Sequence, residues 1–216
     1  MKKKLIFATG NEGKMKEIRE ILNGTGWNVL SLKDAGIDTE IEENGTTFEE
    51  NAKIKAEGIR NWCLENGIPG CSGILAKEII VLADDSGLEI DYLNKEPGIY
   101  SARYAGEDTS YDIKNQMLLD RLQGVPREKR TARFVCAIAA VVPGHEPIVV
   151  RGTIEGYIGD KPAGENGFGY DPIFYVPDLN CSTAELSPEE KNARSHRGNA
   201  LRAMREELKQ YISDVR

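Results

Sequence analysis

Short apolar runs alternate along the chain with segments in which apolar residues recur at three- and four-residue spacing. The run at residues 4–9 precedes a glycine and then a segment with Ile18, Ile21 and Leu22 on one side, which predicts a strand, a tight turn and a helix. Further strands are expected at 27–32, 79–83 and 172–176, further helices at 48–65, 108–122 and from 188 onward, and a long hairpin at 131–142 and 147–158. This mixture predicts an α/β fold with a mixed sheet.

Capping residues mark two helix starts. Thr46 is followed three residues later by Glu49, a spacing typical of a capping box, and Ser187 is followed by a proline and, three positions on, by Glu190. Residues 67–77 are rich in Gly, Pro and Ser, so we expect a surface loop there.

The composition is that of an ordinary globular protein. The 216 residues are 40% hydrophobic and 29% charged, which excludes disordered and collagen-like chains. The 28 Lys and Arg residues against 35 Asp and Glu give a net charge of -7. Because binding to a nucleic-acid backbone needs a basic face, we expect no nucleic-acid partner. Local positive sites could still bind small anions.

Two features bear on the compartment. The basic N-terminus is followed by an apolar run at residues 5–8 only, too short for a signal peptide, and no window approaches the roughly 18 apolar residues of a membrane span. Cys63, Cys71, Cys136 and Cys181 show no C-x-x-C spacing, so we expect free thiols. We therefore expect a cytoplasmic protein that does not bind membranes.

The turn between the first strand and the first helix is a candidate phosphate site. It consists of Thr9, Gly10, Asn11, Glu12, Gly13 and Lys14. Backbone N–H groups at a helix start cradle phosphate, and a nearby lysine adds positive charge. The turn is not a Walker A loop, since it lacks that motif's first glycine and its final hydroxyl residue. The alternative is an ordinary strand-to-helix turn with a solvated lysine.

Carboxylates gather at two places. Asp84 and Asp85 follow the strand expected at 79–83, where they could hold Mg²⁺ and a water at the end of a sheet. An Asx-type turn is the alternative for this pair. Glu42 and Glu43 lie on a loop before the long helix, and they become metal ligands only if the fold brings them to Asp85.

Aromatic and cationic residues mark two later segments. Phe168 and Tyr170 lie in a loop bounded by glycine, which suits stacking on a planar base, although such aromatics also plug the edge of a core. A second group of donors, on what reads as one short helical stretch, consists of Lys191, Ser195, His196 and Arg197. Its alternative is a solvated charged helix face.

Taken together and in this order, these segments resemble the inosine triphosphate pyrophosphatases, also called non-canonical purine nucleoside triphosphate pyrophosphatases. The resemblance is carried by ATGNEGK, EENGTTFEENAKIKA, ADDSGLEID, PGIYSARYAG, FGYDPIF and SPEEKNARSHRGNAL, which span most of residues 5–201. One departure is visible, because the segment at about 57–77 is longer than is usual in the family.

The resemblance implies an activity and an architecture. It implies hydrolysis of inosine, deoxyinosine and xanthosine triphosphates to the monophosphate and pyrophosphate, which removes these bases from the nucleotide pool. It also implies a single domain over residues 1–216, with a mixed twisted sheet flanked by helices, an elongated form, a nucleotide site in a cleft between two lobes, and a homodimer.

The resemblance also implies a role for individual residues. Glu43 and Asp85 would bind Mg²⁺, and Asp85 would act as general base for the attacking water, with Asp84 a weaker candidate for an indirect role. The expected contacts to the triphosphate and the base come from Thr9, Gly10, Asn11, Glu12, Gly13, Lys14, Lys55, Ser86, Arg103, Phe168, Gly169, Tyr170, Asp171, Lys191, His196 and Arg197. Phe168 would stack on the base, while Lys191, His196 and Arg197 would donate to its 6-oxo group.

Two other functions are compatible with these motifs. One is a related pyrophosphatase for modified or pyrimidine nucleotides, and the other is a nucleotide sensor without catalysis. Against the sensor stand both intact carboxylate positions, since a sensor does not need a hydrolytic metal site. A covalent mechanism is not expected, because no serine or cysteine has a plausible histidine partner.

Overall fold

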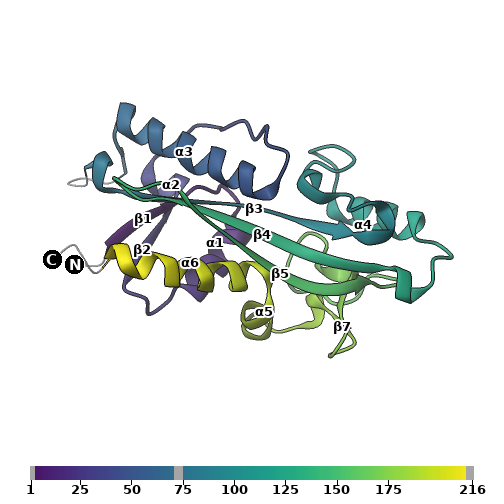
Figure 1. The fold of residues 1–216 in the computed structure, drawn as a ribbon. Coiled ribbons are helices and arrows are strands. Elements are labelled where there is room, and N and C mark those ends of the chain that lie inside the picture. Colours follow the sequence, from purple (N-terminus) through teal and green to yellow (C-terminus); the bar gives the residue numbers. More distant parts are fainter. Residues whose placement is uncertain (1–2, 71–74, 213–216) are drawn as a thin grey trace. The chain divides into compact units, whose positions relative to one another are not determined.

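The computed structural model describes residues 3–70 and 75–212, and Cys71 lies outside these ranges. The strands are β1 (Lys3–Phe7), β2 (Trp27–Ser31), β3 (Ile80–Ile90), β4 (Thr131–Val141), β5 (Ile148–Ile158), β6 (Phe174–Val176) and β7 (Cys181–Ser182). The helices are α1 (Glu12–Ile21), α2 (Leu32–Ala35), α3 (Phe48–Asn66), α4 (Tyr111–Arg121), α5 (Pro188–Arg194) and α6 (His196–Ile212), as Figure 1 shows. The predicted α/β class is confirmed.

The strands hydrogen-bond in the order β2-β1-β3-β4-β5-β6-β7, which makes a mixed sheet. β1 runs parallel to both β2 and β3, and β6 runs antiparallel to both β5 and β7. The chain divides into two compact units. Unit 1 comprises Met1–Asp85, Cys136–Gly152 and Arg197–Arg216, and unit 2 comprises Ser86–Val135 and Thr153–His196.

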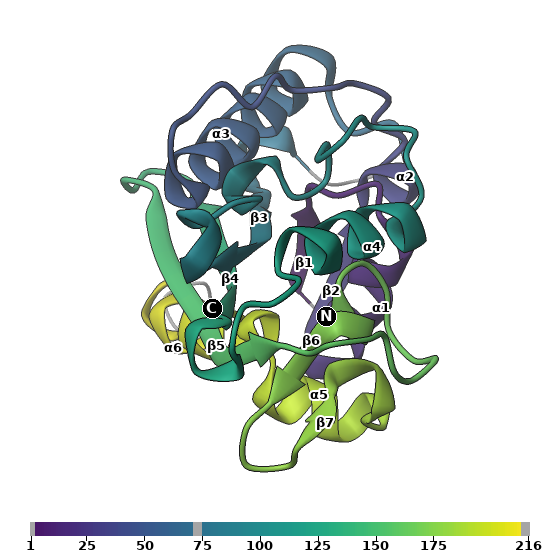
Figure 2. The ribbon, with the colours of Figure 1, turned by 90° about the vertical axis from the view of Figure 1, so that its right-hand side faces the viewer.

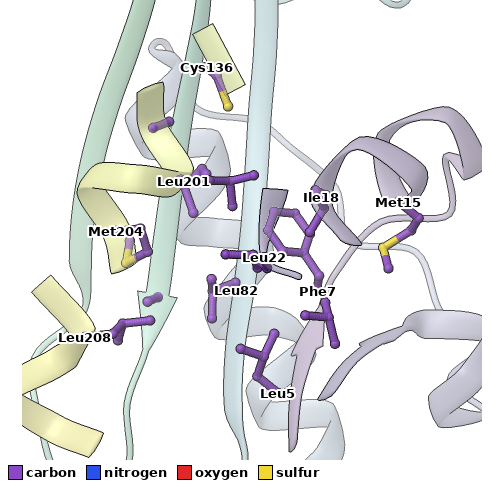
Figure 3. Close-up of a cluster of buried hydrophobic side chains, with 14 of the residues drawn as sticks. Leu5, Phe7, Met15, Ile18, Leu22, Leu82, Cys136, Leu201, Met204 and Leu208 are labelled. Atoms are coloured by element: carbon purple, nitrogen blue, oxygen red, sulfur yellow. The ribbon is translucent and has the colours of Figure 1, made fainter. Parts of the chain in front are cut away.

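The core of unit 1 forms where two helices pack on the strands. Leu5 and Phe7 of β1 lie on one face of the strand, and Leu82 of β3 joins them against Ile18 of α1 and Leu201 of α6, as Figure 3 shows. Ile6 between them is also buried, on the other face. α3 covers the opposite face of these strands from α1 and α6 (Figures 1 and 2). The two faces of the strands in unit 1 therefore meet different helices.

Unit 2 has a core of its own. Leu88 and Ile90 at the end of β3 pack with Leu118 of α4, with Leu122 directly after this helix and with Phe174 of β6. α4 is easily located in Figure 2. Burial of these side chains fixes α4 against the strands of unit 2, because each buried leucine or isoleucine stabilises the folded state by roughly 1.5–3 kcal/mol.

The largest difference from the predicted elements concerns β3. The strand was expected to end at residue 83, but it runs to Ile90 and passes through Asp84 and Asp85. The carboxylates therefore lie within a strand rather than after it. β1 pairs with β3 only as far as Leu82, while β4 is the hydrogen-bonded neighbour on the other side of β3. The extended backbone thus continues beyond the β1 pairing, through polar residues that pattern alone assigns to a turn.

Smaller differences concern the helix ends. Thr47, not Thr46, caps α3, because its hydroxyl accepts from the Glu50 N–H at 3.1 Å. The capping box at Ser187 is confirmed. The donors expected on one helical stretch are split, since α5 ends at Arg194 and α6 begins at His196.

Two absences concern the described part of the chain. None of its helices combines the length and the apolar character needed to cross a membrane. Cys63, Cys136 and Cys181 are free thiols there, as expected.

Candidate functional site

Asp84 and Asp85 project to opposite faces of β3. Because side chains alternate along a strand, Asp84 shares the face of Leu82, which packs with α1 and α6. Asp85 lies on the other face, where the Asn51 side chain of α3 donates to its Oδ2 at 3.0 Å. Two neighbouring carboxylates are thus placed in different surroundings.

Asp84 is a fully buried anion that holds two cations. Its Oδ2 lies 3.0 Å from Lys14 Nζ and 3.5 Å from Arg197 Nη2. The Arg197 guanidinium also pairs with Glu17 of α1. Burial alone would raise the pKa of Asp84, but Lys14, Arg197 and Lys55 together hold that pKa well below its ordinary value. Asp84 therefore stays ionised and fixes the positions of Lys14 and Arg197.

The turn at residues 9–14 opens α1 as expected. Asn11 is the N-cap, and its Oδ1 accepts from Lys14 N–H at 2.9 Å, while Thr9 Oγ1 accepts from Asn11 N–H at 3.2 Å. The first N–H groups of a helix have no partner within that helix. A Cβ added at Gly10 would meet no atom within 4 Å, so the protein itself gives no steric reason for glycine at this position.

Asp85, Glu43 and Lys55 form the second charged group of unit 1. Lys55 Nζ lies 2.8 Å from Glu43 Oε1 and donates to the Asp84 carbonyl at 3.1 Å. Burial raises the pKa of Asp85 to about 6, the Asn51 hydrogen bond opposes this shift, and the nearby charge of Glu43 adds to it. The fold thus brings Glu43 to Asp85, as the metal-site hypothesis required.

Asn51 was not predicted from the sequence, yet it contacts the predicted site residue Asp85. Its side chain is buried, its Oδ1 accepts from Gly45 N–H at 2.8 Å, and its Nδ2 donates to Asp85. It therefore ties the loop that carries Glu43 and Gly45, which we call the acidic loop, to β3. The signal was available, because Asn51 and Lys55 are polar residues one turn apart on the side of α3 that carries the buried Ala52 and Ala56.

The donor set fits a divalent cation held partly by water. Glu43 and Asp85 are two hard oxygen donors, and Mg²⁺ usually takes one or two carboxylates and keeps several waters. Burial and the charge of Glu43 both disfavour ionised Asp85, and a nearby cation would relieve this. Among residues 3–70 and 75–212 there is no group of three or more His, Cys, Asp or Glu side chains placed to hold a metal.

In unit 2, Asp171 organises the loop of residues 167–171, which we call the Phe168 loop. Its Oδ2 accepts from Phe168 N–H at 2.8 Å and pairs with Lys191 Nζ at 2.7 Å, and its Oδ1 accepts from Thr183 Oγ1 at 2.9 Å. Lys191 Nζ also lies 4.9 Å from the centroid of the Phe168 ring. The buried carboxylate therefore orients Phe168, whose ring stays 36% exposed.

The segment at residues 97–106, which we call the Arg103 loop, carries the other cation of unit 2. Arg103 is exposed and lies over the ring of Tyr100 at 5.1 Å. The loop is tied down by Ser101, whose Oγ accepts from Leu88 N–H at 2.9 Å, and by the Tyr170 hydroxyl, which donates to the Ser101 carbonyl at 2.7 Å. Burial raises the pKa of Tyr170, so this donor keeps its proton.

The remaining predicted residues are placed as follows. Ser86 is a half-buried residue of β3. Ser195 is the C-cap of α5, and its N–H donates to the Lys191 carbonyl at 2.8 Å. The His196 ring stacks on Phe134 with centroids 4.9 Å apart and lines a small cavity together with Lys191. His196 belongs to unit 2 and Arg197 to unit 1, so the predicted base readers do not belong to one compact unit.

These features can be compared with known proteins. The model of the Ham1 family matches residues 5–207. The chain belongs to the Ham1 family. The motif resemblance is confirmed at this level.

Relatives of the Ham1 family resemble the chain over nearly its whole length. A dITP/XTP pyrophosphatase of Clostridium perfringens is 48% identical over 96% of this chain and 98% of its own. One of Bacillus licheniformis is 51% identical over 94% and 96%. The solved structure of the Staphylococcus aureus Ham1 protein matches with a TM-score of 0.81 at 41% identity, covering 97% of this chain and all of its own.

The different surroundings of the two aspartates predict unequal contributions to the free energy of unfolding. Asp84→Asn should lower the free energy of unfolding by about 3 kcal/mol, because the buried Arg197 and the half-buried Lys14 lose the anion that they share and Arg197 keeps only its pair with Glu17 among the two ion pairs described above. Asp85→Asn should change it by less than about 1 kcal/mol, because an amide oxygen still accepts from Asn51 and no buried charge is needed there. Urea unfolding at pH 7 in a metal chelator measures both. Equal losses in the two variants would contradict this assignment.

Proposed function

We propose that this protein hydrolyses deoxyinosine, inosine and xanthosine triphosphates to the monophosphate and pyrophosphate, in the cytoplasm, and so keeps these bases out of DNA and RNA. The observation that carries the proposal is the near full-length identity of 48% and 51% to relatives named dITP/XTP pyrophosphatases. The charged groups around Asp84 and Asp85 support the proposal. They contain ammonium groups that can bind phosphates and carboxylates that can bind a metal ion.

In this proposal Glu43 and Asp85 hold Mg²⁺. When bound, this ion would neutralise charge on the phosphate oxygens. Asn51 keeps Asp85 and the acidic loop together, and Lys55 limits the repulsion between Glu43 and its neighbours.

The reaction breaks the bond between the α-phosphorus and the oxygen that bridges to the β-phosphate. Water attacks the α-phosphorus, its proton passes to Asp85, and pyrophosphate leaves with the bridging oxygen. The turn at residues 9–14, Lys14, Lys55 and Arg103 bind the phosphates, and Ser86 adds a hydroxyl. Because an aspartate is a weak base, we expect Asp85 to act mainly by orienting the water.

Base selection falls to Phe168 and to donors around it. Phe168 stacks on the purine, while Gly169, Tyr170 and Asp171 shape the loop that presents it. Lys191, His196 and Arg197 donate to the 6-oxo group. Adenine has an amino donor at this position, and a buried donor without an acceptor costs about 1–3 kcal/mol, so each lost bond disfavours ATP by roughly tenfold or more.

A substrate panel tests the proposal. With Mg²⁺, the wild-type protein should release pyrophosphate from dITP, ITP and XTP at comparable kcat/KM, and from ATP at least about a hundredfold more slowly. Asp85→Asn should lower turnover by several orders of magnitude. A preference for pyrimidine triphosphates would favour the related pyrophosphatase, and tight dITP binding without pyrophosphate release would favour a sensor.

Gly10→Ala tests the phosphate turn. The KM for dITP should rise about tenfold, because a methyl group would obstruct the approach of a phosphate to the backbone. The thermal midpoint should stay within about 1 °C of wild type, since the added Cβ meets nothing within 4 Å. Gly156→Ala is the matched control for crowding. Its added Cβ would lie 2.4 Å from the Tyr175 carbonyl oxygen, so this variant should lower the thermal midpoint. An unchanged KM in Gly10→Ala would remove the turn from the site.

We also propose a homodimer. Light scattering at micromolar concentration should then give a mass twice the 23.9 kDa of one chain. A mass of one chain would reject the dimer and leave the chemistry untouched.

A further inference from the structure

Two adjacent residues of α4 in unit 2 are buried although neither is fully satisfied there. Lys114 is 1% exposed and Asn115 is 3% exposed. Lys114 Nζ has no carboxylate within ion-pair distance in the described part of the chain, and Asn115 Oδ1 accepts no hydrogen bond there. Burying an ammonium without a counter-ion, or an amide oxygen without a donor, costs free energy that burying an apolar side chain would not. Stability alone therefore does not explain these two residues.

Lys114 and Asn115 each donate a hydrogen bond to a carbonyl of a loop. Lys114 Nζ donates to the Ala102 carbonyl at 2.6 Å, next to Arg103 in the Arg103 loop. Asn115 Nδ2 donates to the Gly169 carbonyl at 3.1 Å, next to Phe168 in the Phe168 loop. One turn of α4 thus holds both loops, each at the residue beside its exposed functional side chain.

A third contact joins the two loops directly. Tyr170 of the Phe168 loop donates its hydroxyl to the Ser101 carbonyl at 2.7 Å, and its buried ring meets Tyr111 of α4 edge-on, with centroids 5.2 Å apart. Lys114 Nζ in turn lies 5.0 Å from the centroid of the Tyr111 ring. Helix and both loops are therefore linked in a closed set of contacts, all within unit 2.

We propose that Lys114, Asn115 and Tyr170 form a brace that sets the spacing between Arg103 and Phe168, so that phosphate binding and base recognition depend on each other. The three are positioning residues that act through the loops. The inference rests on the proposed function, in which Arg103 serves the triphosphate and Phe168 the base.

The brace predicts a split between two binding probes. Lys114→Met should weaken binding of inorganic triphosphate at least fivefold and leave binding of inosine within twofold. Asn115→Leu should do the reverse, because it releases only the Phe168 loop. Neither thermal midpoint should fall, since each variant removes an incompletely satisfied buried polar group. Lys129→Met and Gln116→Leu, exposed positions of unit 2, are the matched controls and should change neither probe.

Tyr170→Phe tests the link between the loops. In the wild-type background, Arg103→Ala and Phe168→Ala should each lower kcat/KM for dITP. The product of these two factors should differ at least fivefold from the factor for the double variant, because the effects of coupled residues are not additive. In the Tyr170→Phe background the two factors should multiply.

The outcomes separate the brace from the proposed function. Three results would overturn the brace alone if the wild-type protein releases pyrophosphate from dITP. Each of Lys114→Met and Asn115→Leu could weaken binding of both probes equally, both variants could leave binding of both probes unchanged, or the coupling between Arg103 and Phe168 could survive Tyr170→Phe. Probe binding that splits as expected in a protein that releases no pyrophosphate from dITP would overturn the proposed function and leave the brace.

Discussion

The buried charge of Asp84 is the interaction on which the rest of unit 1 depends. An isolated carboxylate at this depth would be strongly unfavourable, and the ion pairs with Lys14 of α1 and Arg197 of α6 offset this cost, with the charge of Lys55 adding to them. The same two contacts fix the Lys14 ammonium beside the turn at residues 9–14 and the Arg197 guanidinium at the start of α6. One anion on β3 thus orders side chains that are far apart in the chain, and its burial is the reason that it can do so.

The alternation of β3 gives the neighbouring aspartate a different chemistry. Asp85 faces α3, where the Asn51 amide donates to it, and burial raises its pKa to about 6 although the charges of Lys55 and Lys14 oppose this shift. A strand therefore gives Asp84 and Asp85 two different environments, which the turn expected from the sequence pattern would not. In a turn both side chains could share one solvated environment, whereas in a strand between two helical layers they cannot.

Unit 2 repeats this use of buried polar groups to present exposed ones. Asp171 is satisfied by Phe168, Thr183 and Lys191, and its contacts leave the Phe168 ring accessible. In the proposed brace, the buried Lys114 and Asn115 of α4 likewise hold two loops by hydrogen bonds, at a cost in the free energy of unfolding. Such buried polar contacts allow a loop to be rigid without being buried itself.

The sequence by itself determined the α/β class, most strands and helices, and the family, because these depend on local periodicity, caps and motifs that a single segment contains. It also identified the charged and aromatic groups, including Glu43, Asp85 and Phe168. Only the tertiary structure decided that β3 continues through Asp84 and Asp85, that these two face different helices, and that Asn51 reaches Asp85. It also decided that Lys114 and Asn115 reach the carbonyls of Ala102 and Gly169. Each of those facts depends on pairing or packing between segments distant in sequence, and no spacing within one segment encodes which carbonyl or carboxylate a buried side chain will reach.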